Sequence, residues 1–245
     1  GIRDKLVTGV QTCALPIFPA AMVEVRQPAP GSDAGCILLL SHVLNELGPE
    51  GLAEVLKLAG SSAAVLWVEA GTRENSRALM AVREQLIRTH AVIAPCTHGL
   101  PCGMLTPGME QHWCHFFAAP PPDIFSDSDW TRFAQRAGID LRSLPYSYLV
   151  LEKAGCRGSG PVRDELAVRV VGEPRIYKGY ARVFACGGGG LSECMLQKRD
   201  FPVLFRAMKN GTAAGTHRMA CQAGKVVSVQ PWPADSGAAV TPEPC

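Results

Sequence analysis

The sequence lacks a long apolar run, a strong net charge and a secretory signal. No apolar run among its 245 residues reaches the ~18 that a membrane-spanning helix needs, which excludes such a helix within this sequence. The formal net charge is only +2, so the chain as a whole has no basic or acidic character. A leader with a charged start, an apolar middle and a small-residue cleavage site is absent. We therefore expect a reducing compartment, in which the ten cysteines favour a metal site over disulfides.

The first part of the chain alternates apolar runs with segments of helical period. The runs have the character of buried parallel strands. The longest helical segment, residues 73–90, has Leu79, Val82 and Leu86 on one side and Arg and Glu on the other. This alternation predicts an α/β fold with a doubly wound sheet. The predicted strands lie at residues 36–40, 63–71, 91–95 and 146–153, and the predicted helices at 48–60, 73–90 and 129–139.

The carboxyl ends of the first two predicted strands carry polar residues. Ligands of doubly wound sheets bind beyond these strand ends. This rule places Ser41, His42, Asn45, Glu46 and Glu69 beside any pocket. For Asn45 and Glu46, a strand-end turn with a helix cap explains the residues as well as a catalytic role does. The glycine-rich turn that usually holds a nucleotide in such sheets is lacking, and we expect it upstream of this sequence.

Residues 1–17 do not have the character of a domain start. The stretch Val7–Ile17, VTGVQTCALPI, is similar to the translation of a sequencing-library adapter. We therefore expect residues 1–17 to be non-native, Cys13 to be no natural cysteine, and the native chain to begin near Phe18. An adapter joined to coding sequence also predicts that an upstream part of the protein is missing. A genuine but poorly structured N-terminus is the alternative.

The sequence beyond Gly155 consists of short β-rich runs separated by turns, which predicts a small β extension over residues 156–234 and a flexible tail over 235–245. From residue 169 to 225 there are ten Lys or Arg and three Asp or Glu, a local net charge of +7. A basic extension on a mildly acidic body indicates a polyanion partner, and a solvated basic face is the equal alternative. The glycine run 187–190 predicts a hairpin turn rather than a phosphate cradle.

Four cysteines form the most informative pattern. Cys96, Cys102 and Cys114 lie in the turn-rich segment 93–118, and Cys186 lies far downstream in ARVFACGGGG. Thiolates are soft ligands that suit zinc or an iron–sulfur cluster. Paired zinc cysteines usually have two to four residues between them, whereas the gaps here are five and eleven residues. The wider gaps favour a cluster over a single ion.

Two alternatives remain open for these cysteines. One is a zinc ion held by three cysteines with His98 or His115, and the other is a chance grouping of structural thiols. Cys36 has the character of a buried strand residue. The cysteines whose spacing carries no signal, and which we leave unassigned, are Cys156, Cys194, Cys221 and Cys245.

The segments SHVLNEL, VEAGT, APCTHGLPC, WCHF and PRIYKGYARVFAC together resemble one known family. They are similar to the methyltransferase-like assembly factors of the mitochondrial-type ribosomal small subunit, a family with bacterial and mitochondrial members. The similarity runs from about Ala34 to Pro233. The proline–cysteine–histidine segment followed by WCHF is specific, whereas VLNEL alone is a weak signal.

The resemblance implies a class I, Rossmann-like methyltransferase fold, of which residues 18–155 form the C-terminal part, with a Cys-rich insertion and a β extension. It also implies a [4Fe–4S] site. The family commonly has proline after the first and second ligand cysteines, where this chain has Thr97 and Gly103. The ligands themselves are retained. Carried over position by position, they are Cys96, Cys102, Cys114 and Cys186.

The resemblance further implies an assembly or translation factor that binds the small ribosomal subunit and its rRNA, with the cluster in a structural role. One alternative is an active S-adenosylmethionine-dependent rRNA methyltransferase with the methyl donor beside Ser41, Asn45 and Glu46, although this chain lacks the donor loop. The second is a zinc-stabilised RNA-binding domain. The bacterial cytoplasm is the expected compartment, or the mitochondrial matrix in a eukaryote. The candidate rRNA contacts are Arg175, Lys178, Arg182, Lys198 and Arg199.

Overall fold

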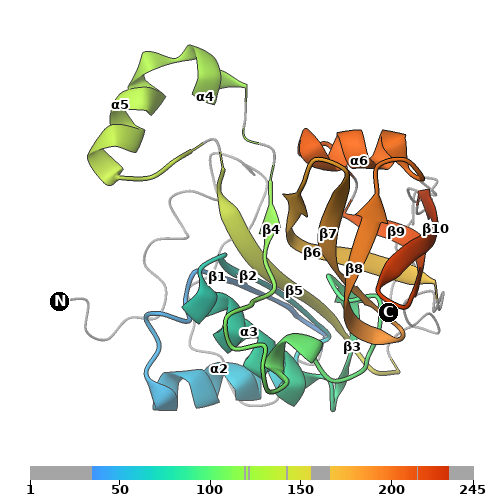
Figure 1. The fold of residues 1–245 in the computed structure, drawn as a ribbon. Coiled ribbons are helices and arrows are strands. Elements are labelled where there is room, and N and C mark those ends of the chain that lie inside the picture. Colours follow the sequence, from blue (N-terminus) through green and yellow to red (C-terminus); the bar gives the residue numbers. More distant parts are fainter. Residues whose placement is uncertain are drawn as a thin grey trace.

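The computed structural model describes residues 35–118, 120, 122–141, 143–155, 166–213 and 215–231. Figure 1 shows an open sheet with helices and, beside it, a β-barrel. The predictions for residues 1–17, for the tail 235–245, and for Cys13, Cys156 and Cys245 lie outside the described residues. No helix in the described part of the chain is both long and apolar enough to cross a membrane.

The open sheet has the strand order β1-β2-β5-β3, with β4 paired to the start of β5. β1 and β2 are parallel, and β5 runs antiparallel to both β2 and β3. The predicted strands are therefore present, and β5 lies antiparallel between β2 and β3. The elements of this sheet are β1 (Ile37–Ser41), β2 (Ala64–Ala70), β3 (His90–Ala94), β4 (Phe116–Phe117) and β5 (Pro145–Lys153).

Two helices, α2 (Pro49–Ser61) and α3 (Arg73–Leu86), connect β1 to β2 and β2 to β3. Pro49 occupies the first turn of α2, where a missing N–H costs no hydrogen bond. The Thr72 side chain caps α3 by accepting a hydrogen bond from the Asn75 N–H at 3.3 Å. The prediction for α3 was four residues too long, because His90 belongs to β3.

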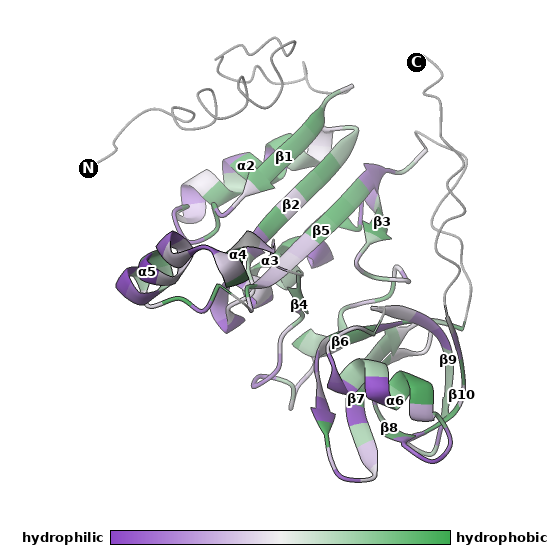
Figure 2. Cartoon of the chain, turned by 90° about the horizontal axis from the view of Figure 1, so that it is seen from above, coloured by the Kyte–Doolittle hydropathy of each residue, from purple (hydrophilic) through white to green (hydrophobic). Residues whose placement is uncertain are grey.

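Both helices cover the same face of the sheet (Figure 1). Trp67 is fully buried in the core that the two helices form with the strands. In the part of the chain that the structure describes, the second helical layer of a doubly wound sheet is not seen, so the Rossmann-like class stays a prediction. β1 and β2 are hydrophobic along most of their length (Figure 2). On β1 the side chains of Ile37 and Leu39 are 73% and 65% exposed, whereas Leu38 and Leu40 pack against the core. Cys36 was expected to be a buried strand residue, but it is exposed and precedes β1.

The β extension forms a closed five-stranded barrel with the order β10-β8-β7-β6-β9. All neighbouring strands are antiparallel except β8 and β10, which are parallel. Gly187 pairs with Gly190, which confirms the predicted hairpin turn. The helix α6 (Pro202–Lys209) between β8 and β9 was not predicted. The barrel strands are β6 (Ala167–Ile176), β7 (Tyr180–Gly187), β8 (Gly190–Gln197), β9 (Thr216–Gln222) and β10 (Lys225–Pro231).

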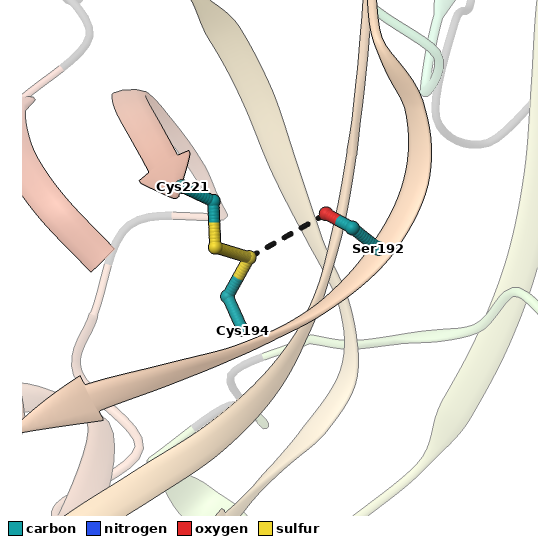
Figure 3. The surroundings of a disulfide bond; sticks show 3 residues. All are labelled: Ser192, Cys194 and Cys221. Atoms are coloured by element: carbon teal, nitrogen blue, oxygen red, sulfur yellow. Dashed lines mark hydrogen bonds between the residues drawn. A yellow bond between two sulfur atoms is a disulfide. The ribbon is translucent and has the colours of Figure 1, made fainter. Parts of the chain in front are cut away.

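A disulfide joins Cys194 on β8 to Cys221 on β9, two strands that are separated by β10 in the barrel (Figure 3). The Cys194 sulfur also lies 3.4 Å from the Ser192 hydroxyl oxygen. Both cysteines pack in the barrel core. The expectation that the cysteines favour metal over disulfides was therefore wrong for this pair, whose separation of 27 residues gave no signal.

A helical arm follows β4 and lies at the edge of the molecule in Figure 1. It consists of α4 (Asp123–Ser126) and α5 (Ser128–Ala137), the second of which corresponds to the helix predicted at 129–139. Asp127 caps α5 and Gly138, with a φ of 66°, ends it. No residue of α5 is buried, and Trp130 and Phe133 are 43% and 51% exposed. The arm contributes little to the core.

Candidate metal centre

The four predicted cysteines come from four different places in the fold. Cys96 follows β3 after one proline, and Cys102 precedes the short 3₁₀ helix η1 (Gly103–Leu105). Cys114 lies two residues before β4, and Cys186 is the penultimate residue of β7 in the barrel. All four are free thiols and partly buried. Three therefore belong to the connection between β3 and β4, and one belongs to the barrel.

The structure brings these four cysteines together between the sheet and the barrel. Cys96, Cys102 and Cys114 line one cavity of about 30 Å³. Cys102, Cys114 and Cys186 pack against one apolar cluster, built around Met80, Met104 and Val171. The thiols also act on one another electrostatically, since Cys96, Cys102 and Cys186 all raise the pKa of Cys114. The four thiols therefore lie near one another where the sheet meets the barrel.

Burial is the largest influence on these thiols. It raises the pKa of Cys102, and it raises the pKa of Cys186 to about 12. For Cys114 the pKa lies well above the ordinary value, because burial and then repulsion from the other three cysteines disfavour the thiolate. Metal ligation requires the thiolate. A metal bound here would therefore displace protons that these buried thiols hold tightly.

Helix α3 fastens the cysteine segment to the sheet through arginine side chains. Arg73 Nε donates to the Glu110 carbonyl at 3.0 Å. Arg77 Nη1 lies 3.0 to 3.1 Å from three carbonyl oxygens, those of Met104, Met109 and His112. The polar side of α3, which its amphipathic period assigned to solvent, is here an anchoring surface for the loop that carries Cys102 and Cys114.

Arg83, one turn and a half further along α3, is buried at the site itself. Its side chain is only 3% exposed and pairs with Glu84 at 2.5 Å. Its Nη2 donates to the carbonyls of His98 at 3.2 Å and Leu100 at 2.9 Å. Burial alone would lower the pKa of Arg83, but its charge interaction and hydrogen bond with Cys96, together with Glu84, outweigh this and raise it. A buried cation therefore lies against the first cysteine.

A second arginine approaches from the barrel. Arg169 on β6 is paired in register with Cys186 on β7. Its guanidinium lies 5.6 Å from the centre of the Phe116 ring, and its buried Nε has no hydrogen-bond partner in the described part of the chain. Its charge lowers the pKa of both Cys114 and Cys186, although burial outweighs this effect. The thiols thus lie between the buried cation of Arg83 and the half-buried cation of Arg169.

His98 is the histidine that reaches the cysteines. Its Nε2 lies 3.2 Å from the Cys186 sulfur, and its Nδ1 accepts a hydrogen bond from the Leu100 N–H at 3.1 Å. A neutral ring with Nδ1 as acceptor carries its proton on Nε2, which therefore donates to the sulfur. Burial and then the charge of Arg83 lower the pKa of His98, which favours this neutral form.

His115, the other histidine considered for zinc, packs elsewhere. Its ring stacks on Trp113 with a centroid distance of 5.0 Å and lies against Gly172 of β6. Across the residues that the structure describes, no three His, Cys, Asp or Glu side chains are arranged to hold a single metal ion. This holds for the four cysteines and for the zinc set with His98 as well as for the zinc set with His115, so the metal centre stays a prediction.

The two positions that depart from the family pattern both contact the barrel. Thr97 Oγ1 donates to the Ala167 carbonyl at 2.9 Å and lies 3.4 Å from the Cys186 carbonyl. Gly103 lies so close to β8 that a Cβ on it would be 2.5 Å from the Leu191 Cβ. Where the family commonly has proline, this chain has one side chain that binds the barrel and one residue small enough to touch it.

The residues predicted beside a methyl-donor pocket lie together at the end of β1. Ser41, Asn45 and Glu46 are exposed. They line neither the cavity at the cysteines nor the one at the helical arm. Glu69 is fully buried, and its Oε1 accepts hydrogen bonds from the N–H groups of Val43 and Leu44, each at 3.1 Å. Glu69 therefore holds the strand-end turn, a role that its position on β2 alone did not reveal.

The five predicted rRNA contacts are all exposed on the barrel. Arg175 and Arg182 share one carboxylate, that of Glu193, the second at 3.8 Å. Arg199 pairs with Asp200 at 3.2 Å, and Lys198 lies over the Phe205 ring at 5.9 Å. Lys178 lies in the turn between β6 and β7. The predicted basic surface exists, but part of its charge is neutralised by Glu193 and Asp200.

A family model for a mitochondrial small ribosomal subunit protein, Rsm22, matches residues 23–215 of the chain. The match covers well over half of the sequence and includes all four cysteines of the centre. No curated protein is similar enough to count as a match.

Proposed function

This chain belongs to the mitochondrial small ribosomal subunit Rsm22 family, and we propose that it binds the rRNA of the small subunit as an assembly or translation factor. The family match supports a function that involves the small ribosomal subunit. It is the same family that the sequence motifs resemble. Beyond the family match, we propose that RNA is the direct partner, that the cysteines form a metal centre, and that the compartment is the one expected from the sequence. The observation that carries the proposal is the meeting of Cys96, Cys102 and Cys114 with Cys186 of the barrel.

These four cysteines would hold a [4Fe–4S] cluster. The donor set fits, because four thiols with no other covalent partner converge from two bodies. The charge also fits, since a cluster with four thiolates is an anion, and the buried guanidinium of Arg83 and the half-buried one of Arg169 would flank it. The N–H group of His98 would hydrogen-bond one ligand sulfur. When bound, the cluster supplies a covalent cross-link between the sheet and the barrel.

The zinc alternative is less well supported. A zinc ion with Zn–S bonds of ~2.3 Å draws its four sulfurs to within ~3.8 Å of one another in a tetrahedron. A cubane cluster is wider, so its ligand sulfurs stand farther apart. The gaps of five and eleven residues between Cys96, Cys102 and Cys114 are wider than those usual between paired zinc cysteines, and this spacing favours the cluster.

The cross-link would set the direction of the basic barrel surface relative to the sheet. Polyphosphate backbones bind exposed Lys and Arg through salt-sensitive, weakly sequence-specific contacts. Lys178 and Arg182 are the best placed of the five cations, one in an exposed turn and the other on the outer face of β7. The role of the cysteine centre is then to position this surface, and not to take part in a reaction.

Methyl transfer is the second candidate, and the described residues give it less support. The Glu69 carboxylate binds the backbone turn that carries Val43 and Leu44, and Asn45 is exposed. Binding of S-adenosylmethionine by calorimetry, followed by methyl transfer to small-subunit rRNA, tests it directly.

The proposed function is tested by co-sedimentation of the protein with isolated small ribosomal subunits over a range of salt concentrations. The double variant Lys178→Glu/Arg182→Glu should bind more weakly, and its salt slope should fall by about 2, because two phosphate contacts are lost. The matched control is Lys57→Glu/Arg88→Glu, which makes the same charge change at exposed positions on the sheet side. Equal co-sedimentation of both double variants would refute the assignment of the barrel surface.

A further inference from the structure

The barrel has the strand arrangement of the OB-fold. Numbered from β6, its strands close in the order 1-2-3-5-4, strands 3 and 5 are parallel, and a helix lies between strands 3 and 4. Five-stranded barrels of this kind bind oligonucleotides or oligosaccharides on the outer face of strands 2 and 3 and at the loop between strands 1 and 2. In this chain these elements are β7, β8 and the turn formed by residues 177–179.

The side chains of β7 divide that outer face into two halves. Ala181, Val183 and Ala185 are buried in the barrel core, so Tyr180, Arg182, Phe184 and Cys186 point outward, because side chains alternate along a strand. The inner half, toward the Cys186 end of β7, is covered by the cysteine segment, whereas the outer half lies toward the Tyr180 end. Cys186 belongs to the candidate centre, and the His112 ring packs edge-on against Phe184 with a centroid distance of 4.7 Å.

The outer half of the face is open and carries an aromatic platform. Tyr177 stacks on Tyr180 with a centroid distance of 4.6 Å and an interplanar angle of 13°. The backbone fixes the pair, because the Tyr177 N–H donates to the Tyr180 carbonyl at 2.9 Å. Tyr177 is 43% exposed. One ring of the stack is therefore supported from below, while the other remains accessible to a further planar group.

Cations surround this platform. Lys178 follows Tyr177 directly in the turn, and the Arg182 side chain, 47% exposed, is two residues from Tyr180 on the same face of β7. Arg175 lies opposite Arg182 in register, held over the Phe184 ring at 5.2 Å. Glu193 contacts both arginines and fixes them without neutralising Lys178.

From this combination we infer that the outer half of the β7–β8 face binds single-stranded RNA, with an unpaired base stacked on Tyr177 and the adjacent phosphates at Lys178 and Arg182. This inference rests on the proposed function and specifies its RNA. Single-stranded nucleic acids bind by stacking bases on aromatic rings within a basic groove. A paired base in an A-form helix has both faces covered by its neighbours and offers no face to Tyr177.

The test uses the full chain and a fluorescent RNA of ~12 nucleotides, a length within the site size of one such barrel, both single-stranded and annealed to its complement. Fluorescence anisotropy measures the two affinities. The wild type should bind the single strand more tightly than the duplex. Tyr177→Ala should weaken single-strand binding by ~5-fold or more, because the stacking of one base on an aromatic ring contributes at least that factor. Tyr177→Phe, which keeps the ring, should bind as the wild type does.

The matched control is Phe133→Ala, which removes an exposed aromatic ring from the helical arm and should leave the affinity unchanged. Equal affinity for single strand and duplex, or wild-type binding by Tyr177→Ala, overturns the inference. The outcome is separable from that of the proposed function. If the wild type co-sediments with small subunits while Tyr177→Ala binds RNA normally, only the stacking site is wrong. If the wild type neither co-sediments nor binds either RNA, the proposed function fails.

Discussion

Replacing Arg83 with methionine removes the buried cation at the cysteine centre while keeping most of its aliphatic packing. The side chain is 3% exposed and binds two carbonyls of the cysteine segment as well as Glu84. Loss of one partner from a buried ion pair costs ~3–5 kcal/mol. Glu84 is 28% exposed, so water compensates part of this loss. We therefore expect Arg83→Met to lower the free energy of unfolding by ~3 kcal/mol, at the low end of that range.

The assay is thermal unfolding followed by circular dichroism. For a chain of this size, ~3 kcal/mol corresponds to a fall in Tm of ~6–12 °C. The control is Arg88→Met, which makes the same substitution at an exposed residue just beyond α3 and should change stability by no more than ~0.5 kcal/mol.

A second variant isolates the charge. Adding Glu84→Gln to Arg83→Met removes the unpaired carboxylate but keeps an oxygen that can accept the hydrogen bond from the Cys102 N–H, which Glu84 accepts at 3.1 Å. The double variant should recover ~1–2 kcal/mol relative to Arg83→Met. If Arg83→Met and Arg88→Met have the same Tm, the Arg83 cation does not hold the cysteine segment in place.

Two further predictions concern the junction between sheet and barrel. The variant Cys186→Ser, purified without oxygen, should lack the iron that the wild type binds. The control Cys36→Ser changes an exposed free cysteine and should keep the iron. Equal iron content in the two variants would show that Cys186 is not a ligand. Gly103→Ala should lower the free energy of unfolding by ~1–3 kcal/mol, because the added methyl group overpacks against Leu191. The control Gly99→Ala should be nearly neutral, because its methyl group would have no atom within 4 Å. If urea unfolding finds no difference between the two variants, η1 does not pack against β8.

The apolar pattern was sufficient to find four strands of the open sheet and the two helices that cover it, because burial on one side leaves a clear period in the sequence. It missed β4, which has only two residues. It did not specify strand partners. β5 inserts antiparallel between β2 and β3, and nothing in the composition of a buried strand states its direction. The helix α6 was missed because its eight residues lie between two strands in a segment with turn-like composition.

The sequence pattern predicted least well the partners of polar side chains that point into the protein. Arg77 and Arg83 lie on the polar side of an amphipathic helix, and the period cannot distinguish solvent from a loop that offers carbonyl groups. Glu69 was placed correctly at a strand end, but its partner is a backbone turn. The bond between Cys194 and Cys221 depends on two non-neighbouring barrel strands, which no local signal encodes. The four clustered cysteines were identifiable because their residue types and gaps are unusual in themselves.

The most direct test of the cysteine centre is the metal and sulfide content of the wild-type protein purified without oxygen. If the four cysteines hold a [4Fe–4S] cluster, we expect about four iron atoms and about four acid-labile sulfides per chain. We also expect a broad absorption band at ~400 nm that is lost on exposure to a chelator and an oxidant. A colourless protein with one zinc ion per chain, or with no metal, would contradict it.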